Sequence, residues 1–218
     1  MRITYLAAVW IALAGSAAAQ AGGESPSHFK LALSFGSLGI GPEVTYRPER
    51  HFGVRASASL FRISHSEDID GIRYRGKLKL GNYGAMADVY PFGGGFRISG
   101  GARYAENRLR LRAMPSTSVT VGNTIYTPAQ IGTLDGDITT RKFEPLVTMG
   151  YGGTVTKGLS LGIDAGVMFQ GTPKMSPLTS STGFVSSVDL ANERAQIQDD
   201  IHGYKYYPVL QASLGYRF

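Results

Sequence analysis

From Phe29 to the C-terminus, apolar and polar residues alternate along most of the chain, and this period of two restricts the fold more than any other feature. Successive side chains of a β-strand point to opposite faces, so such a period indicates strands whose two faces differ chemically. The segment from Leu159 to Val167 is typical, because apolar residues alternate there with serine, glycine and aspartate. The sequence therefore predicts an all-β chain.

Eight segments of this kind are predicted to form an antiparallel, up-and-down barrel. Their predicted ranges are 28–36, 39–48, 52–65, 72–91, 95–113, 137–156, 158–172 and 203–218. The fourth segment breaks the alternation, because Leu80 falls on one parity and Ala85 on the other. Gly81 and Gly84 bracket the change, so we predict a bulge or a glycine kink there.

The connections between these segments alternate between short and long. Short connections are expected around residues 48–51, 93–95 and 156–158, and long ones at 64–71, 114–136 and 172–203. Short turns at one end and long loops at the other are typical of bacterial outer-membrane barrels, in which the short side is periplasmic. Such barrels have even strand numbers, which favours eight over seven.

Two of the long connections contain further predicted structure. A small hairpin is expected where residues 119–121 and 124–126 flank Gly122 and Asn123. A helix is expected from Leu190 to Asp200, with Asp189 as its cap and Gly203 ending it. Its position, over the barrel mouth or above it, stays open.

The first nineteen residues have the anatomy of a secretory signal peptide. Arg2 precedes an apolar run, and the alanines at 17–19 form a cleavage pattern. The run is shorter than the roughly 20 residues that a membrane-spanning helix needs. We therefore expect export and a mature barrel domain over residues 20–218. The chain contains no cysteine, which excludes disulfides and thiolate metal sites.

Alternation alone does not say which face of the barrel is apolar. A soluble barrel places its apolar face inward, and a membrane barrel places it outward. The polar face here is rich in glycine and serine, which suits the narrow interior of an eight-stranded barrel. Aromatic residues near strand ends suit interfacial girdles: Phe29, Tyr46, Phe96, Phe143, Tyr151, Phe169 and Tyr216. These features favour the membrane.

The last strand ends in Tyr216 and Phe218, and it looks like the sorting signal that the outer-membrane assembly machinery recognises. Segments 36–41, 89–97 and 207–209 are similar to motifs of small eight-stranded outer-membrane proteins, in the broad grouping of the outer membrane protein A and W barrels. The resemblance implies location in the cell outer membrane. It also implies contact with outer-membrane lipids and lipopolysaccharide, assembly by that machinery, and a monomer.

Charged residues on the polar parity are predicted to form a network inside the barrel. They are Lys30, Glu43, Arg47, Arg55, Lys77, Lys79, Asp88, Arg97, Arg103, Glu144 and Asp164. Unpaired buried charge is costly, so cations and carboxylates are expected to pair. A salt-bridged filling of the lumen is favoured over a selective conduit, because eight strands leave little free bore.

Catalysis and cofactors find little support in the sequence. Residues 64–67 hold serine, histidine and glutamate together, as lipid A deacylases do, but neighbours on an extended chain point to opposite faces. Asp68, Asp70 and Gly71 lack the further ligands of a calcium loop, so a turn is predicted. We predict no catalytic residue, metal or cofactor, and no nucleic-acid partner despite a net charge of +6, because the chain is exported.

The function predicted from the sequence is therefore a structural or surface-interaction role in the outer membrane. Two alternatives stay open. One is a narrow channel for small solutes, and the other is a lipid-modifying enzyme that uses His65 and Ser66.

Overall fold

The computed structural model describes residues 28–69, 71–156 and 158–218. The predicted signal peptide and the expected start of the mature chain lie outside these residues. The strands are β1 (Phe29–Gly36), β2 (Gly39–Tyr46), β3 (Phe52–Ile69), β4 (Ile72–Val89), β5 (Phe96–Ala105), β6 (Arg108–Pro115), β7 (Val119–Val121), β8 (Thr124–Tyr126), β9 (Leu134–Thr139), β10 (Phe143–Thr156), β11 (Leu159–Phe169), β12 (Lys174–Met175), β13 (Thr179–Ser180) and β14 (Tyr206–Arg217). The helices are α1 (Pro128–Ile131) and α2 (Ser187–Ile201). Neither described helix is long and apolar enough to cross a membrane.

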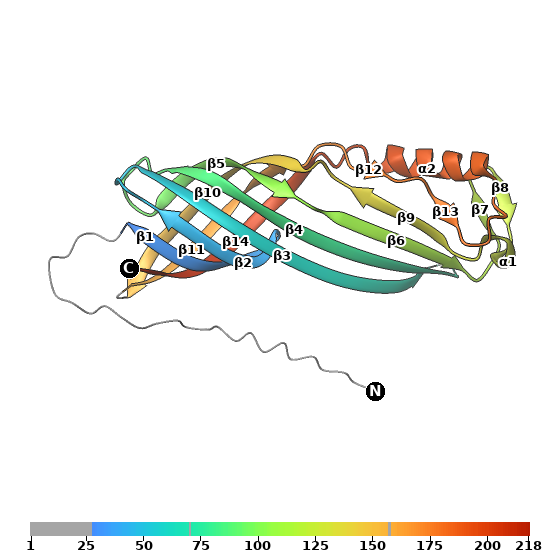
Figure 1. Ribbon diagram of the computed structural model, residues 1–218, viewed down its shortest axis with the longest axis horizontal. Helices are drawn as coiled ribbons and strands as arrows, with labels where there is room; N and C mark the ends of the chain where they lie inside the picture. Colours follow the sequence, from blue (N-terminus) through green and yellow to red (C-terminus); the bar gives the residue numbers. More distant parts are fainter. Residues whose placement is uncertain (1–27, 70, 157) are drawn as a thin grey trace, which may run out of the picture.

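Eight antiparallel spans close into a barrel, as the sequence predicted (Figure 1). Strands β5 and β6 together make one span, because β4 pairs with both of them. Strands β9 and β10 make the next span, because β9 pairs with β6 and β10 pairs with β5. The first strand, β1, pairs with β2 on one side and with the last strand, β14, on the other. This last pairing closes the sheet, so the barrel itself has no free edge.

The first strand starts, and the last one ends, at the end of the barrel where residues 47–51 and 90–95 form short turns, opposite the end that carries α2 and the β7–β8 hairpin. In outer-membrane barrels this is the periplasmic end. The predicted long loop at 64–71 is wrong. Strands β3 and β4 instead continue in unbroken register, from Phe52 opposite Val89 to Ile69 opposite Ile72. They form a long hairpin that projects beyond the barrel at the external end (Figure 1).

The bulge predicted near Gly81 is also wrong. Residues of β4 alternate regularly throughout, with Leu78 and Leu80 on the inward face and Ala85 and Ala87 on the outward face. What changes along β4 is the chemistry of its two faces, not the parity. From Asn82 to Val89, inside the barrel wall, the outward face is apolar and the inward face is polar. From Ile72 to Leu80, in the projecting part, the outward face is charged and the inward face is apolar.

Beyond the barrel, β3, β4, β6 and β9 continue as a sheet, and β12 and β13 pair with β9. Helix α2 and the β7–β8 hairpin lie over the inward face of this sheet (Figure 1). A second apolar core forms there from Val121, Tyr126, Ile131 and Val185. We call this external part the external domain. It comprises the segment from β6 to β9, the segment from β12 to α2, and the projecting end of the β3–β4 hairpin.

Both predicted features of the long connections are present. The hairpin of residues 119–126 forms as β7 and β8. The helix is longer than predicted, and its cap is Ser186, whose hydroxyl oxygen accepts a hydrogen bond from the Val188 amide at 3.2 Å. Asp189, predicted as the cap, lies in the first turn, and the helix ends before Gly203.

The outward face of the barrel is an apolar belt. On β11 it presents Leu159, Leu161, Ile163 and Val167, and half of the Ile163 surface (53%) is exposed. The eleven residues of this strand match the 9–11 that a tilted strand needs to cross a bilayer. A continuous apolar surface around a closed barrel fits hydrocarbon and not water. The chain is thus a barrel of the outer membrane.

A charge placed on this belt should be far more costly than one placed on the outward face of the projecting hairpin. We expect Ile163→Arg to lower the free energy of unfolding by about 2–4 kcal/mol, because the guanidinium would lie near the bilayer midplane. Ser64→Arg, on the outward face of β3 beyond the belt, should cost little. Urea titration of folding into phospholipid vesicles measures both, and equal losses would contradict this assignment of the belt.

Candidate functional site

A layer of charged side chains crosses the barrel interior in its periplasmic half. Six strands each contribute one residue to it. These residues are Lys30 from β1, Glu43 from β2, Arg55 from β3, Asp88 from β4, Arg97 from β5 and Asp164 from β11. All belong to the predicted network, and all face inward because they share the polar parity of their strands. We call this set the ionic layer.

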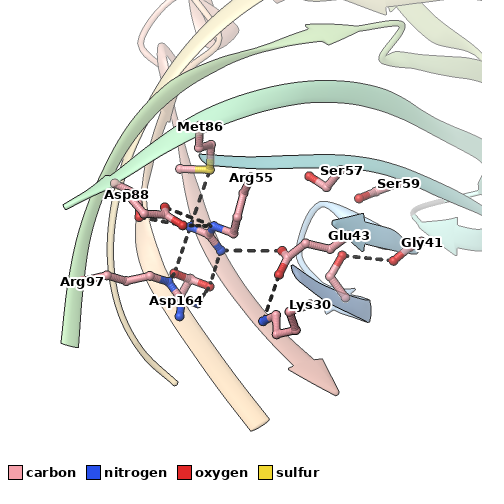
Figure 2. Close-up of polar contacts among 12 residues, drawn as sticks. Lys30, Gly41, Glu43, Arg55, Ser57, Ser59, Met86, Asp88, Arg97 and Asp164 are labelled. Atoms are coloured by element: carbon pink, nitrogen blue, oxygen red, sulfur yellow. Dashed lines mark hydrogen bonds and ion pairs between the residues drawn. The ribbon is translucent and has the colours of Figure 1, made fainter. Parts of the chain in front are cut away.

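Arg55 lies at the centre of the ionic layer and contacts all three carboxylates (Figure 2). Its Nε lies 2.9 Å from Asp88 Oδ2, and its Nη1 lies 3.0 Å from Asp164 Oδ2 and 3.6 Å from Glu43 Oε2. Its Nη2 donates to Ser99 Oγ at 3.0 Å. One guanidinium therefore joins β3 to strands on the other side of the lumen.

Two further pairs complete the ionic layer. Arg97 binds Asp164 with both arms of its guanidinium, through Nε to Oδ1 at 3.0 Å and Nη2 to Oδ2 at 2.5 Å. Lys30 Nζ lies 3.4 Å from Glu43 Oε1. Three cations thus meet three carboxylates, so the layer is neutral. Neutrality matters because each buried ion loses several kcal/mol of hydration, which only close pairing offsets.

Glycine on the neighbouring strand makes room for this pairing. A β-carbon at Gly150, which pairs with Asp164, would lie 2.2 Å from Asp164 Oδ1. A β-carbon at Gly152 would lie 2.8 Å from an Arg97 nitrogen. The alternation of glycine with apolar residues in β10 therefore lets long charged side chains fill a narrow lumen.

Arg103 and Glu144 are buried inside the barrel but lie apart from the ionic layer. Although they are opposite each other on β5 and β10, they form no direct ion pair. Arg103 instead donates to Ser57 Oγ at 3.0 Å and to Ser59 Oγ at 3.2 Å. Glu144 accepts a hydrogen bond from the Thr140 hydroxyl at 2.7 Å. Serine hydroxyls thus hold a charge that the sequence predicted would be paired.

An apolar plug lies on the external side of the ionic layer. It consists of Leu38, Leu146, Met168 and Val209, all almost completely buried. Along β11, Met168 lies four residues closer to the external end than Asp164. Leu38 comes from the short turn between β1 and β2, and its carbonyl accepts a hydrogen bond from the Asn82 side chain at 3.2 Å. The lumen is therefore filled twice, once by charge and once by hydrocarbon.

Arg47 lies at the periplasmic mouth, outside the ionic layer. Its guanidinium donates to the backbone carbonyls of Glu49, Arg50, Gly93 and Gly94, and it stacks 3.7 Å from the centre of the Tyr90 ring. These contacts join the turn after β2 to the turn after β4. The mouth that they border is a cavity of about 510 Å³ that reaches Lys30, Arg55 and Arg97.

The structure places Lys77 and Lys79 away from the predicted network. Both are exposed on the outward face of β4, because the parity of this strand does not change at Gly81. Sequence reasoning also missed Asn82, which is buried in the lumen. Continuous counting of parity along the strand would have found it, since Asn82 shares its parity with Asp88.

The residues weighed for lipid chemistry do not assemble a triad. His65 Nε2 lies 3.9 Å from Glu67 Oε2, and both side chains are largely exposed. Ser64 and Ser66 lie on the opposite face of β3, as adjacent strand residues must. Among the described residues, no group of histidine and acidic side chains could hold a metal ion. Asp70 lies outside the described residues, and Asp68 pairs with Arg73 at 3.1 Å.

One carboxylate stabilises the external domain. Asp189 Oδ2 accepts a hydrogen bond from the Tyr126 hydroxyl at 2.8 Å and so joins α2 to the β7–β8 hairpin. This hydrogen bond lowers the pKa of Asp189 below its ordinary value, because it stabilises the ionised form. The sequence predicted the helix but not this hydrogen bond, which attaches the helix to the hairpin.

Removal of one carboxylate from the ionic layer should be costly. Asp164→Asn leaves Arg97 without a carboxylate in the lumen, so we expect a loss of about 3–5 kcal/mol in the free energy of unfolding. The matched control is Asp137→Asn, which breaks an exposed pair with Arg110 and should cost less than about 1 kcal/mol. Circular dichroism during urea unfolding measures both. Similar losses would show that the ionic layer does not support the barrel.

Comparison with known proteins agrees with this architecture. No protein-family model and no curated protein matches the sequence. Two crystal structures from Acinetobacter baumannii are similar in fold. CarO2 has a TM-score of 0.62 at 20% identity, over 87% of this chain and 98% of that one, and CarO has a TM-score of 0.60 at 18% identity, over 88% and 98%. The protein therefore has the fold of the small eight-stranded outer-membrane β-barrels, as its motifs predicted.

Proposed function

We propose that this protein is a closed, non-enzymatic barrel that anchors its external domain at the cell surface, where the domain interacts with other molecules. The observation that carries the proposal is the double filling of the lumen. A neutral ionic layer and an apolar plug occupy successive levels of the same narrow interior. A barrel filled in this way supports an anchoring role better than it supports solute passage.

The external domain has the features of a working part. It has an apolar core of its own around Ile131, and an ion pair of Arg112 with Asp135 at 2.6 Å joins two neighbouring strands of its sheet. It also contains an apolar cavity of about 180 Å³ between β6 and α2, bordered by Leu111, Leu134 and Ile197. A structured, hollowed domain outside the membrane suits recognition at the surface.

A narrow channel is the second candidate, and one observation favours it. The cavity at the periplasmic mouth is about 510 Å³ and reaches the ionic layer. Passage would require Arg55 and Arg97 to leave their carboxylates, and Leu38 and Met168 to separate. Each buried ion that loses its partner costs several kcal/mol, so such opening would be rare. The lipid-modifying alternative has less support, because the side chains of Ser64 and Ser66 lie on the face of β3 opposite to that of His65.

Planar-bilayer recording tests the closed state. We expect no steady single-channel steps from the wild-type barrel after insertion is verified by its heat-modifiable gel mobility. The matched variant Leu38→Ala with Met168→Ala shrinks the plug but leaves the ionic layer intact, so it should also stay silent. Steady steps from the wild-type protein would refute the anchoring role in favour of the channel.

A further inference from the structure

The outward face of the external sheet is strongly basic. Nine exposed cations project from three of its strands and from β12. They are Arg62 on β3, Arg73, Arg75, Lys77 and Lys79 on β4, Arg108, Arg110 and Arg112 on β6, and Lys174 on β12. We call these nine residues the basic face. The opposite face of β4 and β6 is mainly apolar, and part of it lines the external cavity.

Strand register arranges the basic face in rows. Arg62 lies opposite Lys79, which lies opposite Arg108 on the next strand. Thr139 follows on β9, and Lys174 lies opposite it on β12. This first row therefore carries four cations across five neighbouring strands. The next two rows pair Lys77 with Arg110 and Arg75 with Arg112.

Carboxylates neutralise only part of this charge. Asp68, Asp135 and Asp137 pair with cations of the basic face, and each pair is exposed. Nine cations against three carboxylates leave an excess of six positive charges, equal to the net charge of the whole chain. Among the described residues, Arg62 and Lys79 have no ion-pair partner. Their charge is therefore available to a ligand.

The basic face begins directly above the apolar belt. Tyr83 and Tyr104 stack on adjacent strands, with ring centres 5.4 Å apart, at the external limit of the belt. Such aromatic pairs mark the membrane interface. Lys79 and Arg108 lie four residues nearer the external end, on the same two spans and the same face. At about 3.3 Å per residue and a tilt near 40°, this first row lies about 10 Å above the tyrosines.

The level between belt and basic face carries little net charge. Glu106, Arg141 and Lys142 are exposed where β5 meets β6 and where β9 meets β10, and Lys142 Nζ lies 6.0 Å from the centre of the Tyr104 ring. These three residues sum to one positive charge, against an excess of six on the basic face, so most of the positive charge lies above this level. The phosphate groups on the headgroups of a bilayer leaflet lie at the height of the first row of the basic face, within reach of its long lysine and arginine side chains.

We propose that the basic face binds the phosphorylated sugar headgroups of the glycolipid in the external leaflet. Arginine forks match phosphate oxygens in geometry, and lysines add point charges. A row of cations spaced by neighbouring strands can bridge phosphates on one headgroup or on two. The proposal requires only that the barrel spans the outer membrane, so it stands or falls separately from the closed lumen.

Lipid binding to the folded barrel tests the proposal. The probes are lipid A with two phosphates and dephosphorylated lipid A with the same acyl chains, titrated against protein in zwitterionic detergent and counted by native mass spectrometry. We expect Arg62→Gln with Lys79→Gln to weaken binding of the bisphosphorylated lipid by at least about tenfold, since each surface cation contributes roughly a few-fold. Added salt should weaken wild-type binding as well.

The matched control removes two exposed cations from elsewhere, Arg50 in a periplasmic turn and Lys205 before β14, by Arg50→Gln with Lys205→Gln. It should bind as the wild type does. Unchanged affinity in the first variant would overturn the proposal. So would an equal loss in the control, which would indicate general attraction, or equal affinity for the dephosphorylated lipid, which would indicate acyl-chain contacts alone. Gel mobility before and after heating verifies that each variant folds.

Discussion

The pairing of β1 with β14 is the contact on which the rest of the structure depends. Hydrocarbon offers no hydrogen bonds, so every backbone amide and carbonyl in the membrane must find a partner within the sheet. Closure over the register from Lys30 opposite Arg217 to Gly36 opposite Gln211 satisfies the last free edge. It also fixes an inside and an outside, and the alternation of side chains then divides each strand between lipid and lumen.

The ionic layer follows from that closure. A narrow lumen removes water from the charges that face it, so their stability depends on partners rather than on hydration. Arg55 and Asp164 are 109 residues apart in sequence yet lie 3.0 Å apart across the barrel. Such contacts tie strands that share no backbone hydrogen bonds. Beyond the membrane the chemistry of the two faces reverses. Water reaches the outward face, which carries the charged residues, and α2 covers part of the inward face, which carries leucines.

The sequence was sufficient for the barrel and less so for its contacts. Alternation predicted eight strands and the inward position of Arg55, Arg97 and Asp164, because parity is a local property. It failed on β4, where Lys77 and Lys79 were assigned to the lumen because they are charged. They lie on the outward face beyond the membrane, where water and not lipid meets that face. The choice of Arg55 as the centre and the insertion of Leu38 depend on barrel shear and on turn geometry, which no local pattern contains.

The central claim is that the two faces exchange chemistry at the membrane boundary while the strand stays regular. Spin labels placed singly along β4, with collision by oxygen and by a water-soluble nickel complex, test it directly. We predict that labels at Ala85 and Ala87 meet oxygen, that labels at Lys77 and Lys79 meet nickel, and that a label at Leu80 meets neither. A label at Leu80 that is open to lipid, with one at Lys79 enclosed, would show that the parity slips and that the account is wrong.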